Sequence, residues 1–346
     1  MMLNNKSVFN NKVILITGGT GSFGKQFVEH VLENYSPKKV IIFSRDELKQ
    51  FEMEKELKNK KLRFFIGDVR DQSRLTLACQ GVDVIIHAAA LKHVKIAEYN
   101  PQECIKTNIN GAENVIFAAL KNKVEKVIAL STDKASNPIN LYGATKLVSD
   151  KLFVAANNLI GQSKTRFGIV RYGNVLNSRG SLIPLILDSI KKKKKTFPIT
   201  DTRMTRFFMS LDDSVKFTIK SLNYLRGGEI FIPKLPSLRI VDLVKYFDKK
   251  IKFKIIGKKP GEKIHETLFS NDESENIVEY ENFYILEPEI IFTSRHKKKI
   301  KEKKILKYNK ILKSGYVYSS KNNSNFLDLK DIGKLVNSVI HNIKDD

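Results

Sequence analysis

The sequence is poor in cysteine and has no tryptophan: its 346 residues include only Cys79 and Cys104. Two cysteines are too few for a disulfide framework and lack the spacing of a metal site, so we expect both to be small buried residues and no metal to be bound. No apolar run reaches the length of about 18 to 20 residues that a membrane helix needs, and the N-terminal segment has no hydrophobic signal core. These absences predict a cytoplasmic protein that binds no membrane.

Acidic residues are also few: 37 Asp and Glu face 61 Lys and Arg, which gives a formal net charge of +24. Such a charge often indicates a nucleic-acid or membrane partner. Here the excess is mostly lysine, without the arginine forks and aromatic platforms of nucleic-acid readers, so we expect no nucleic acid. The lysine-rich runs at 191–195 and 296–304 are interpreted as solvated faces or loops, with a functional anion patch as the alternative.

Six apolar runs of strand length alternate with helical patterns in the first half of the chain, at 12–16, 39–43, 62–66, 82–87, 126–130 and 166–171. This alternation predicts an α/β fold with a doubly wound parallel sheet of the Rossmann type, whose ligands bind at the carboxyl ends of the strands. The pattern weakens further on. We therefore predict a dinucleotide-binding domain at 1–175, a smaller substrate-binding domain at 176–290 with segments that return to the first domain, and a C-terminal extension at 291–346.

A glycine-rich turn, TGGTGSFG at 17–24, follows the first predicted strand and opens a helix. Its glycines allow a tight turn, a close approach of the backbone to a pyrophosphate and close packing of the helix on the sheet. The helix N-terminus attracts phosphates through its N–H groups and its dipole. A purely structural turn is the alternative. The predicted dinucleotide contacts in this turn are Gly18, Thr20, Gly21, Ser22, Phe23 and Gly24.

The second strand ends without the acidic residue that usually binds the ribose 2′-hydroxyl of NAD. Ser44 and Arg45 stand there instead, and Lys49 follows one turn later. These side chains suit a 2′-phosphate, so the sequence predicts NADP. The alternative is that Asp46 binds the ribose and Arg45 is merely exposed.

The ends of the next two strands supply further predicted cofactor contacts. Asp68 and Val69 follow the third strand, where a carboxylate and an apolar neighbour could meet the adenine. Ala88 follows the fourth strand, and its small side chain leaves room for a ribose and the nicotinamide.

The fifth strand leads into a catalytic pattern. Tyr142 stands ten residues after Thr132, and Lys146 follows Tyr142 by one helical turn. Residues four apart share a helix face, so we expect the Lys146 ammonium beside the phenol, where it would lower the pKa of Tyr142. A phenolate can remove a hydroxyl proton while hydride leaves the same carbon for nicotinamide. The alternatives are a turn cap for Thr132, a capping aromatic for Tyr142 and a surface position for Lys146.

Eight segments together resemble the extended short-chain dehydrogenase/reductase superfamily, and within it the UDP-N-acetylglucosamine 4,6-dehydratases. The resemblance is greatest to the inverting type, which also epimerises C5 and begins pseudaminic acid synthesis. It runs from about residue 11 to residue 288 and continues more loosely from 316 to 329. The segments are TGGTGSFG, SRDELKQ, FIGDVRD, HAAALKHV, STDKASNPINLYGATK, VRYGNVLNSRGS, DTRMTRF and PGEKIHE.

This resemblance implies a homo-oligomeric hydro-lyase with tightly bound NADP that is regenerated in each cycle. C4 would be oxidised, water lost across C5 and C6, hydride returned to C6, and C5 reprotonated from the opposite face. Lys134 would be the base for the C5 proton, with its pKa depressed by burial and by Lys146. Asp133, if protonated, would give its proton to the departing 6-hydroxyl. Membrane-anchored retaining relatives have methionine at the place of Tyr142, so the tyrosine favours the inverting type.

The resemblance also implies the substrate contacts. Lys92 would lie near the sugar and the nicotinamide, and Asn174 at the pyrophosphate. Arg206 and Lys259 would grip the diphosphate, beside Glu262 in the Pro-Gly-Glu turn. The family usually has arginine in place of Lys259, and a lysine cannot make the bidentate fork. His93 and His265 are interpreted as structural, with an acid–base role as the alternative.

The predicted product is UDP-2-acetamido-2,6-dideoxy-β-L-arabino-hex-4-ulose. Alternatives are a dehydratase with added 3-epimerase activity and a retaining dehydratase. An alternative of another class is a regulatory protein that binds NADP without turnover. Thr132, Tyr142 and Lys146 together argue against that last class, because a pure binder needs no activated phenol.

Overall fold

The computed structural model describes residues 8–176, 181–290, 310–312 and 315–340. A ten-stranded sheet forms its centre, in the order β16-β14-β15-β10-β6-β5-β4-β1-β2-β3. These strands are β1 Val13–Thr17, β2 Lys39–Ser44, β3 Leu62–Ile66, β4 Val84–His87, β5 Lys126–Thr132, β6 Arg166–Tyr172, β10 Ile230–Pro233, β14 Ile277–Glu279, β15 Phe283–Leu286 and β16 Lys310–Ile311. The strands β1 to β6 and β10 are parallel, whereas β15, β14 and β16 extend the sheet in antiparallel pairs.

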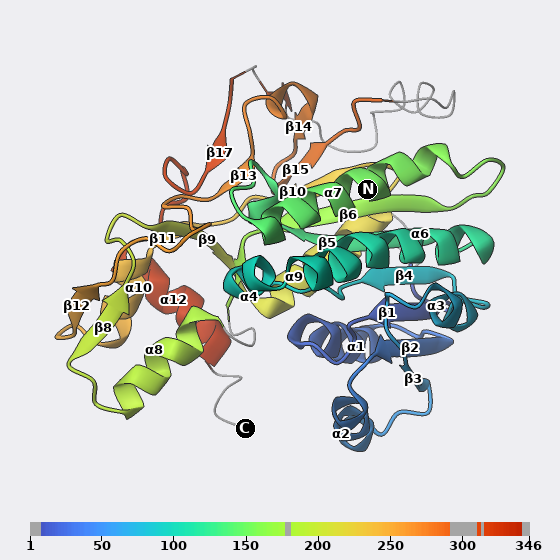
Figure 1. Ribbon diagram of the computed structural model, residues 1–346, viewed down its shortest axis with the longest axis horizontal. Coiled ribbons are helices and arrows are strands. Elements are labelled where there is room, and N and C mark those ends of the chain that lie inside the picture. The colour runs from blue at the N-terminus through green and yellow to red at the C-terminus, as the bar shows by residue number, and fades with distance from the viewer. Residues whose placement is uncertain (1–7, 177–180, 291–309, 313–314, 341–346) are drawn as a thin grey trace.

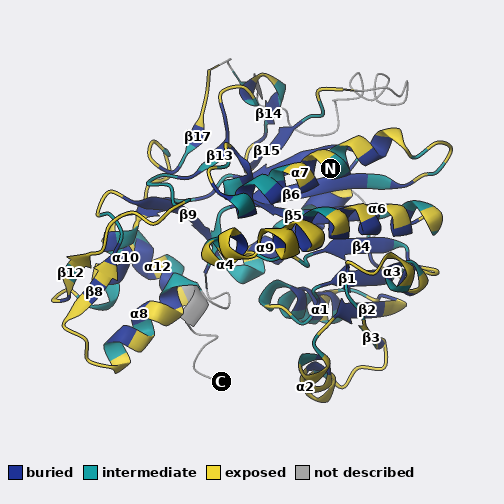
Figure 2. Ribbon diagram, viewed as in Figure 1, coloured by how far each residue is buried: buried dark blue, intermediate teal, exposed yellow. Residues whose placement is uncertain are grey.

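Helices cover both faces of this sheet (Figure 1). They are α1 Ser22–Asn34, α2 Glu47–Leu57, α3 Gln72–Ala78, α4 Val94–Tyr99, α5 Pro101–Ile105, the π-helix η1 Lys106–Asn110, α6 Gly111–Lys121, α7 Leu141–Ala155 and α9 Leu211–Tyr224. Packing pairs α3 with α6 and α6 with α7, whereas α1 packs with α9. The strands between them are buried, and the helices expose their outer surfaces (Figure 2). Buried β-branched and aromatic strand residues therefore form one continuous core.

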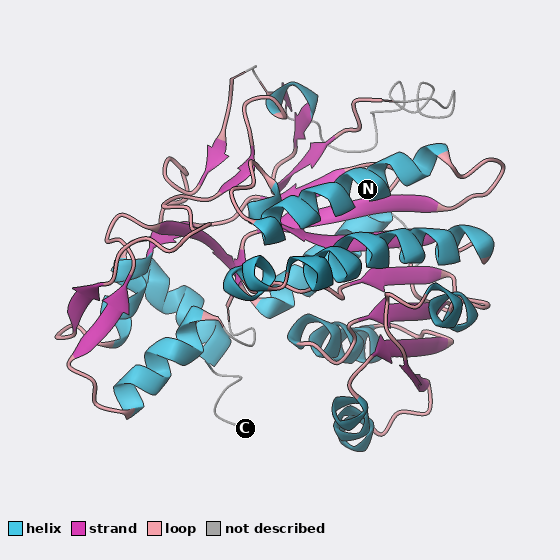
Figure 3. Ribbon diagram, in the orientation of Figure 1, coloured by secondary structure: helices cyan, strands magenta, loops and turns pink. Residues whose placement is uncertain are grey.

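A second group of elements lies beside the large sheet (Figure 3). It contains small sheets made of β7 Asn174–Val175, β8 Thr196–Ile199, β9 Thr205–Met209, β11 Ser237–Arg239, β12 Lys252–Ile255, β13 Thr267–Phe269 and β17 Tyr318–Ser319. Its helices are α8 Leu182–Lys191, α10 Ile240–Phe247 and α12 Leu329–Ile340. Three single turns complete the described elements: η2 Asp133–Ala135 after β5, η3 Ala156–Asn158 after α7, and η4 Ser274–Asn276 before β14. A separate hydrophobic cluster joins α8, α10 and α12, with Ile183, Leu243 and Ile332 at its centre.

The predicted fold class is confirmed, and the strand ends shift by at most two residues. The fifth strand was predicted to end at residue 130 but runs on to Thr132, so Thr132 belongs to the strand. Both cysteines are buried, as predicted. The domain limits at 175 and 290 stay predictions; the structure places β10, β14 and β15 in the large sheet and packs α12 against α8 and α10. The run at 296–304 lies outside the described residues, as do residues 291–309, 313–314 and 341–346 of the predicted extension at 291–346.

No helix in the described part of the chain is both long and apolar enough to cross a bilayer. Within the same residues, no group of His, Cys, Asp and Glu side chains is arranged to hold a metal ion.

Candidate active site

The glycine turn between β1 and α1 forms a cradle that larger residues would fill. Gly18 has a left-handed φ of 68° and donates its N–H to the Phe43 carbonyl at 2.8 Å. A Cβ at Gly18 would lie 2.9 Å from the Ala89 nitrogen, and one at Gly24 would overlap the Gly19 backbone. Gly21 is the N-cap of α1. The turn therefore presents backbone to the carboxyl edge of the sheet, as a bound pyrophosphate requires.

The predicted 2′-phosphate site at the end of β2 is partly engaged by the protein itself. Thr20 donates its hydroxyl to the Ser44 hydroxyl at 3.2 Å. Asp46 caps α2 by accepting the Lys49 N–H at 3.0 Å and also pairs with the Lys49 ammonium. Arg45 is the exposed cation here, with 55% of its side chain accessible and its guanidinium 3.4 Å from Asp68.

Asp68 and Val69 follow β3 and lie next to this site, where Asp68 contacts Arg45. Asp68 accepts hydrogen bonds from Arg70 Nε at 2.9 Å and Nη2 at 2.7 Å. Burial acts to raise the pKa of Asp68, but the Arg70 hydrogen bonds outweigh it and lower the pKa. Val69 is buried, and a Cβ at Gly111 would lie 2.8 Å from its Cγ2. Ala88 continues the backbone ladder by donating to the Thr17 carbonyl at 3.2 Å.

The turn after β5 brings Thr132, Asp133 and Lys134 together. The Thr132 hydroxyl accepts the Lys134 N–H at 3.3 Å and donates to Asp133 Oδ1 at 3.0 Å, so Thr132 does cap this turn. Asp133 is 0% exposed, and Lys134 Nζ donates to the same Oδ1 at 3.0 Å. The second oxygen, Oδ2, is buried without a hydrogen-bond partner in the described structure. The turn therefore holds a buried carboxylate and an ammonium in direct contact.

The predicted cause of an activated Tyr142 phenol is wrong. Burial raises the pKa of Tyr142 to about 12, and the charge of Lys134 and a side-chain hydrogen bond with Thr132 act against this rise. Lys146 is not among the main influences on the Tyr142 pKa, and the charges that act on Lys146 are those of Asp150 and Cys104. Tyr142 is thus a neutral phenol between Thr132 and Lys134.

Lys146 is buried, with 3% of its surface exposed, and burial lowers its pKa. Among the described residues, no side-chain hydrogen bond or ion pair engages its ammonium. The neighbouring His87 is neutral, because burial and the Lys146 charge lower its pKa to about 3, and its Nδ1 lies 2.8 Å from the Thr17 hydroxyl. A buried ammonium at the carboxyl edge of the sheet fits the hydroxyls of a nucleotide ribose. Together with the glycine cradle it fits a dinucleotide.

The prediction that burial and Lys146 depress the pKa of Lys134 is also wrong. Burial acts in that direction, but Asp133 Oδ1 at 3.0 Å and Glu266 Oε1 at 3.5 Å outweigh it and raise the pKa. The repulsive neighbour that matters is Arg206 rather than Lys146. Lys134 is therefore an ammonium in the resting protein.

Two residues of the PGEKIHE segment that the sequence analysis did not assign belong to this cluster. Glu266, 2% exposed, faces Lys134, and Lys263 donates its ammonium to the Ser136 carbonyl at 2.7 Å. Burial lowers the pKa of Lys263. The Asn140 amide donates to the Gly261 carbonyl at 2.7 Å, which fixes the segment against the N-terminus of α7. The sequence offered one signal for these two residues: they are charged and stand in the same short segment as the Pro-Gly-Glu turn.

The predicted substrate residues lie around this cluster, with different degrees of engagement. Arg206 is committed to backbone carbonyls, at 2.8 Å from Thr205 and Lys263 and 2.9 Å from Ile264. Asn174, in β7, has a buried Oδ1 without a partner among the described residues.

The other predicted contacts lie on loops. Lys92 is exposed in the turn after β4, next to Leu91, whose N–H Asn108 accepts at 2.8 Å. Lys259 is exposed, and its N–H donates to Glu262 Oε2 at 3.3 Å. His93 precedes α4 as its N-cap residue, and His265 Nδ1 lies 2.8 Å from the Thr205 hydroxyl.

A buried ionic network lies behind the catalytic turn. Arg171 is fully enclosed and contacts Asp150 Oδ2 at 3.3 Å and Glu273 Oε1 at 2.8 Å. Ser131 donates to Asp150 at 2.8 Å, and Ser136 donates to Glu273 at 3.3 Å. These two serines flank the turn from 132 to 135, so the network fixes both of its ends.

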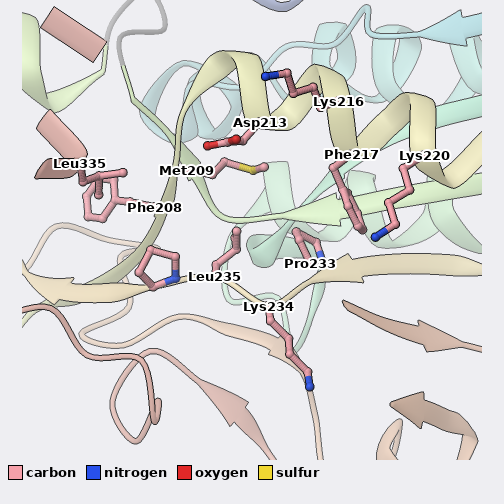
Figure 4. A pocket seen from close by; sticks show the side chains of 11 residues that line it. Phe208, Met209, Asp213, Lys216, Phe217, Lys220, Pro233, Lys234, Leu235 and Leu335 are labelled. Atoms are coloured by element: carbon pink, nitrogen blue, oxygen red, sulfur yellow. The ribbon is translucent and has the colours of Figure 1, made fainter. Parts of the chain in front are cut away.

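A surface pocket of about 310 Å³ lies elsewhere, between α9 and the segment after β10 (Figure 4). None of the predicted site residues lines it. Its lysines already have partners: Lys216 contacts Asp212 at 2.6 Å, Lys234 contacts Glu279 at 2.8 Å, and Lys220 lies over the Phe283 ring. This pocket is separate from the catalytic turn.

The parallel sheet, the glycine cradle and the Tyr142–Lys146 helix define a Rossmann protein of the extended short-chain dehydrogenase/reductase class. Residues 14–288 match the family described as "Polysaccharide biosynthesis protein", and the chain belongs to that family.

Two kinds of relative share much of the chain. An inverting UDP-N-acetylglucosamine 4,6-dehydratase of Campylobacter jejuni is 54% identical over 330 residues, which cover 95% of this chain and 98% of that protein. A UDP-glucose 4-epimerase of Rickettsia bellii is 46% identical over 284 residues, which cover 80% and 83%.

Solved structures share the architecture. Pen from Bacillus thuringiensis superimposes with a TM-score of 0.86 at 37% identity, over 96% of this chain and 98% of that one. DesIV, a dTDP-glucose 4,6-dehydratase from Streptomyces venezuelae with NAD bound, gives a TM-score of 0.66 at 24% identity over 73% and 86%, which shows the fold alone.

Proposed function

We propose that this protein is an inverting UDP-N-acetylglucosamine 4,6-dehydratase, which forms UDP-2-acetamido-2,6-dideoxy-β-L-arabino-hex-4-ulose. The observation that carries the proposal is the direct contact of Lys134 with Asp133 at the end of β5, beside the Tyr142 phenol. The 54% identity to the Campylobacter jejuni dehydratase over almost the whole chain supports it.

The Lys134–Asp133 pair supplies both groups that an elimination of water needs. Transfer of one proton along the 3.0 Å hydrogen bond turns the ion pair into an amine and a carboxylic acid. The amine can then take the C5 proton while the acid protonates the departing 6-hydroxyl, and the two transfers restore the ion pair. This order of proton transfers explains how Lys134 can act as a base although it is an ammonium in the resting protein.

Tyr142 first gives up its own phenol proton to solvent when the positively charged nicotinamide is bound, and the phenolate, with Thr132 hydrogen-bonded to it, would then take the proton of the 4-hydroxyl in the oxidation step. A bound nicotinamide dinucleotide supplies the acceptor for the C4 hydride, which returns to C6 later in the cycle. Lys146 is proposed to hold the nicotinamide ribose, because its side chain is buried and its ammonium makes no hydrogen bond or ion pair with a described side chain. The Ser131–Asp150 contact keeps the strand end that carries Thr132 in register with α7.

NADP is the proposed form of the cofactor, with Arg45 as the main contact to its 2′-phosphate. Arg45 is the exposed cation at the end of β2, whereas Asp46 is occupied in capping α2 and pairing with Lys49. We assign Lys49 a smaller role than the sequence predicts, because its ammonium already has a carboxylate partner.

The UDP part of the substrate is proposed to lie between β7 and the Pro-Gly-Glu turn. Asn174 offers a buried oxygen without a partner, and Lys259 and Lys92 are exposed cations that can reach a diphosphate. Arg206 supports this site indirectly, because it donates hydrogen bonds to the carbonyls of residues 263 and 264 and so fixes the segment after the Pro-Gly-Glu turn. Glu262 fixes the turn through its contacts with Thr200 and the Lys259 N–H.

Self-association is a further part of the proposal. Large apolar side chains are exposed on neighbouring helices: Tyr99 on α4, Phe117 on α6 and Val148 on α7. Exposed apolar groups on packed helices favour contact with a second copy of the chain. Sedimentation velocity of the purified protein tests this, and a monomer at all concentrations would contradict it.

The activity is tested by incubating the purified protein with UDP-N-acetylglucosamine and following the mass and the NMR spectrum of the sugar. The proposal predicts loss of one water and a 4-keto-6-deoxy sugar, without added reductant. A C4 epimer of unchanged mass would instead favour the activity named for the Rickettsia bellii relative. Binding of NADP with no change in the sugar would indicate a regulatory protein.

A further inference from the structure

Glu266 is a second carboxylate beside the Lys134 ammonium, and the proposed reaction gives it no role. Its Oε1 is 3.5 Å from Lys134 Nζ, whereas the Asp133 contact is 3.0 Å long. Both carboxylates are almost fully buried, whereas 22% of the Lys134 side chain is exposed. Lys134 is therefore the one member of this group of three whose side chain reaches the surface.

The backbone holds Glu266 firmly in this place. Its N–H donates to the Ser320 hydroxyl at 2.9 Å, and the Ser320 N–H donates back to the Glu266 carbonyl at 2.9 Å. The Ser320 hydroxyl also lies 2.7 Å from that of Thr205. The second carboxylate oxygen, Oε2, is buried and has no hydrogen-bond partner among the described residues. Its Oε1 also lies 3.6 Å from Arg206 Nε, so the buried charge of Glu266 is shared between Lys134 and Arg206.

The charges that face Lys134 come from four parts of the chain. Asp133 belongs to its own turn, Tyr142 to α7, Arg206 to β9, and Lys263 and Glu266 to the segment before β13. Arg206 and Lys263 are also held by backbone carbonyls, so they stay in place when the charge of Glu266 is removed. Asp133 would then be the carboxylate left to Lys134 and Lys263. Without the Glu266 charge, the Lys134 ammonium would keep only its contact with the adjacent Asp133 carboxylate.

We propose that Glu266 is a positioning residue for the C5 proton transfer: its carboxylate holds the Lys134 ammonium against Asp133 and restrains the release of the ammonium's proton. This role rests on the proposed dehydratase activity. The resting ion pair then stays ready for the transfer to Asp133, and the proton is given up only when the substrate is in place. Raising of the Lys134 pKa by the two carboxylates agrees with this geometry.

The test is the pH dependence of kcat in Glu266→Gln, with 4-keto sugar formation from UDP-N-acetylglucosamine as the assay. Loss of the negative charge 3.5 Å from Nζ makes the Lys134–Asp133 pair give up its shared proton more easily, so the basic limb of the profile, on which the pair loses that proton, moves to lower pH by about one unit or more. We expect kcat at the optimum to fall by about 10- to 100-fold because the ammonium is held less firmly, with little change in KM. A purely structural role would leave the limb in place.

Two further variants complete the test. Glu266→Asp keeps the negative charge but moves it farther from Lys134 Nζ. The limb of its pH profile should therefore lie between those of the wild type and Glu266→Gln. If Glu266→Gln fails to fold, an unshifted limb in Glu266→Asp overturns the proposal. Glu279→Gln removes a carboxylate from the distant pair with Lys234 and should leave the profile unchanged. A wild-type protein without dehydratase activity refutes the proposed function, whereas an active wild type with an unshifted Glu266→Gln limb refutes only the role of Glu266.

Discussion

The Lys134 ammonium and the Asp133 carboxylate are neighbours in the chain and lie 3.0 Å apart at the end of β5. The strand delivers both residues to the carboxyl edge of the sheet, and the single turn η2 then points them toward each other. Because Asp133 is fully buried, this contact is shielded from water and from salt. The pair stores one proton between an acid and a base, and the proposed elimination of water depends on that arrangement.

Removal of the Lys134 amine should stop the reaction after oxidation at C4. We expect Lys134→Ala to lower turnover by about 100- to 10,000-fold, as loss of a general base does. Binding of NADP and of the UDP-sugar should remain nearly normal, and part of the bound NADP should become reduced on mixing with substrate. Stopped-flow absorbance of the reduced cofactor measures this. Lys234→Ala, which removes a lysine paired with Glu279, is the matched control, and near-normal turnover of Lys134→Ala would refute the assignment.

The Tyr142 phenol should titrate far above the usual range in the protein alone. Burial places its pKa at about 12, so the ultraviolet difference between wild type and Tyr142→Phe should show no phenolate at neutral pH. The oxidised nicotinamide carries a positive charge, which favours the phenolate, so NADP⁺ should move the titration to lower pH. NADPH, with an uncharged ring, should have a much smaller effect. An equal shift with both cofactor forms would contradict the proposed place of the nicotinamide.

Arg45→Ala should weaken the binding of NADP much more than that of NAD. A charged hydrogen bond to the 2′-phosphate is worth about 1.5 to 3 kcal/mol, or roughly ten- to a hundredfold in affinity. Isothermal titration of both cofactors measures the difference. Asp46→Asn should spare NADP binding, because that side chain is engaged with α2. Equal losses for NAD and NADP in Arg45→Ala would place the 2′-phosphate elsewhere.

The network behind the catalytic turn should matter more for stability than any exposed ion pair. Arg171→Met leaves Asp150 and Glu273 buried without their cation, which should lower the free energy of unfolding by about 3 to 5 kcal/mol. Arg171 acts to lower the pKa of Asp150, which burial holds above its usual value. In the variant this pKa rises further, so the loss of stability should be smallest at acidic pH and grow as pH rises.

Denaturant unfolding of both proteins over a range of pH measures this loss. Arg203→Met, which breaks an exposed pair with Asp201, should change stability little. A pH-independent loss in Arg171→Met would show that Asp150 does not titrate as described.

The parts of the site that follow from local sequence could be predicted, and those that depend on distant segments could not. The glycine turn and the start of α7 were predicted to within one residue, and the end of β5 to within two, because each depends on strand and helix patterns within a few residues. The charge state of Lys134 was predicted wrongly because Glu266 lies 132 positions away in the chain and meets it only in the fold. The same holds for Arg171 with Glu273, since pairing of buried charges leaves no periodic pattern in the sequence.

The central claim is that this chain removes water from UDP-N-acetylglucosamine and inverts C5, and the configuration of the product tests it most directly. The wild-type protein should be incubated with the substrate in heavy water, and the product examined by NMR. The account predicts an L-configured 4-keto-6-deoxy sugar with deuterium at C5 and with the original C4 hydrogen at C6. A D-configured product, or one that retains its 6-hydroxyl, would contradict the account.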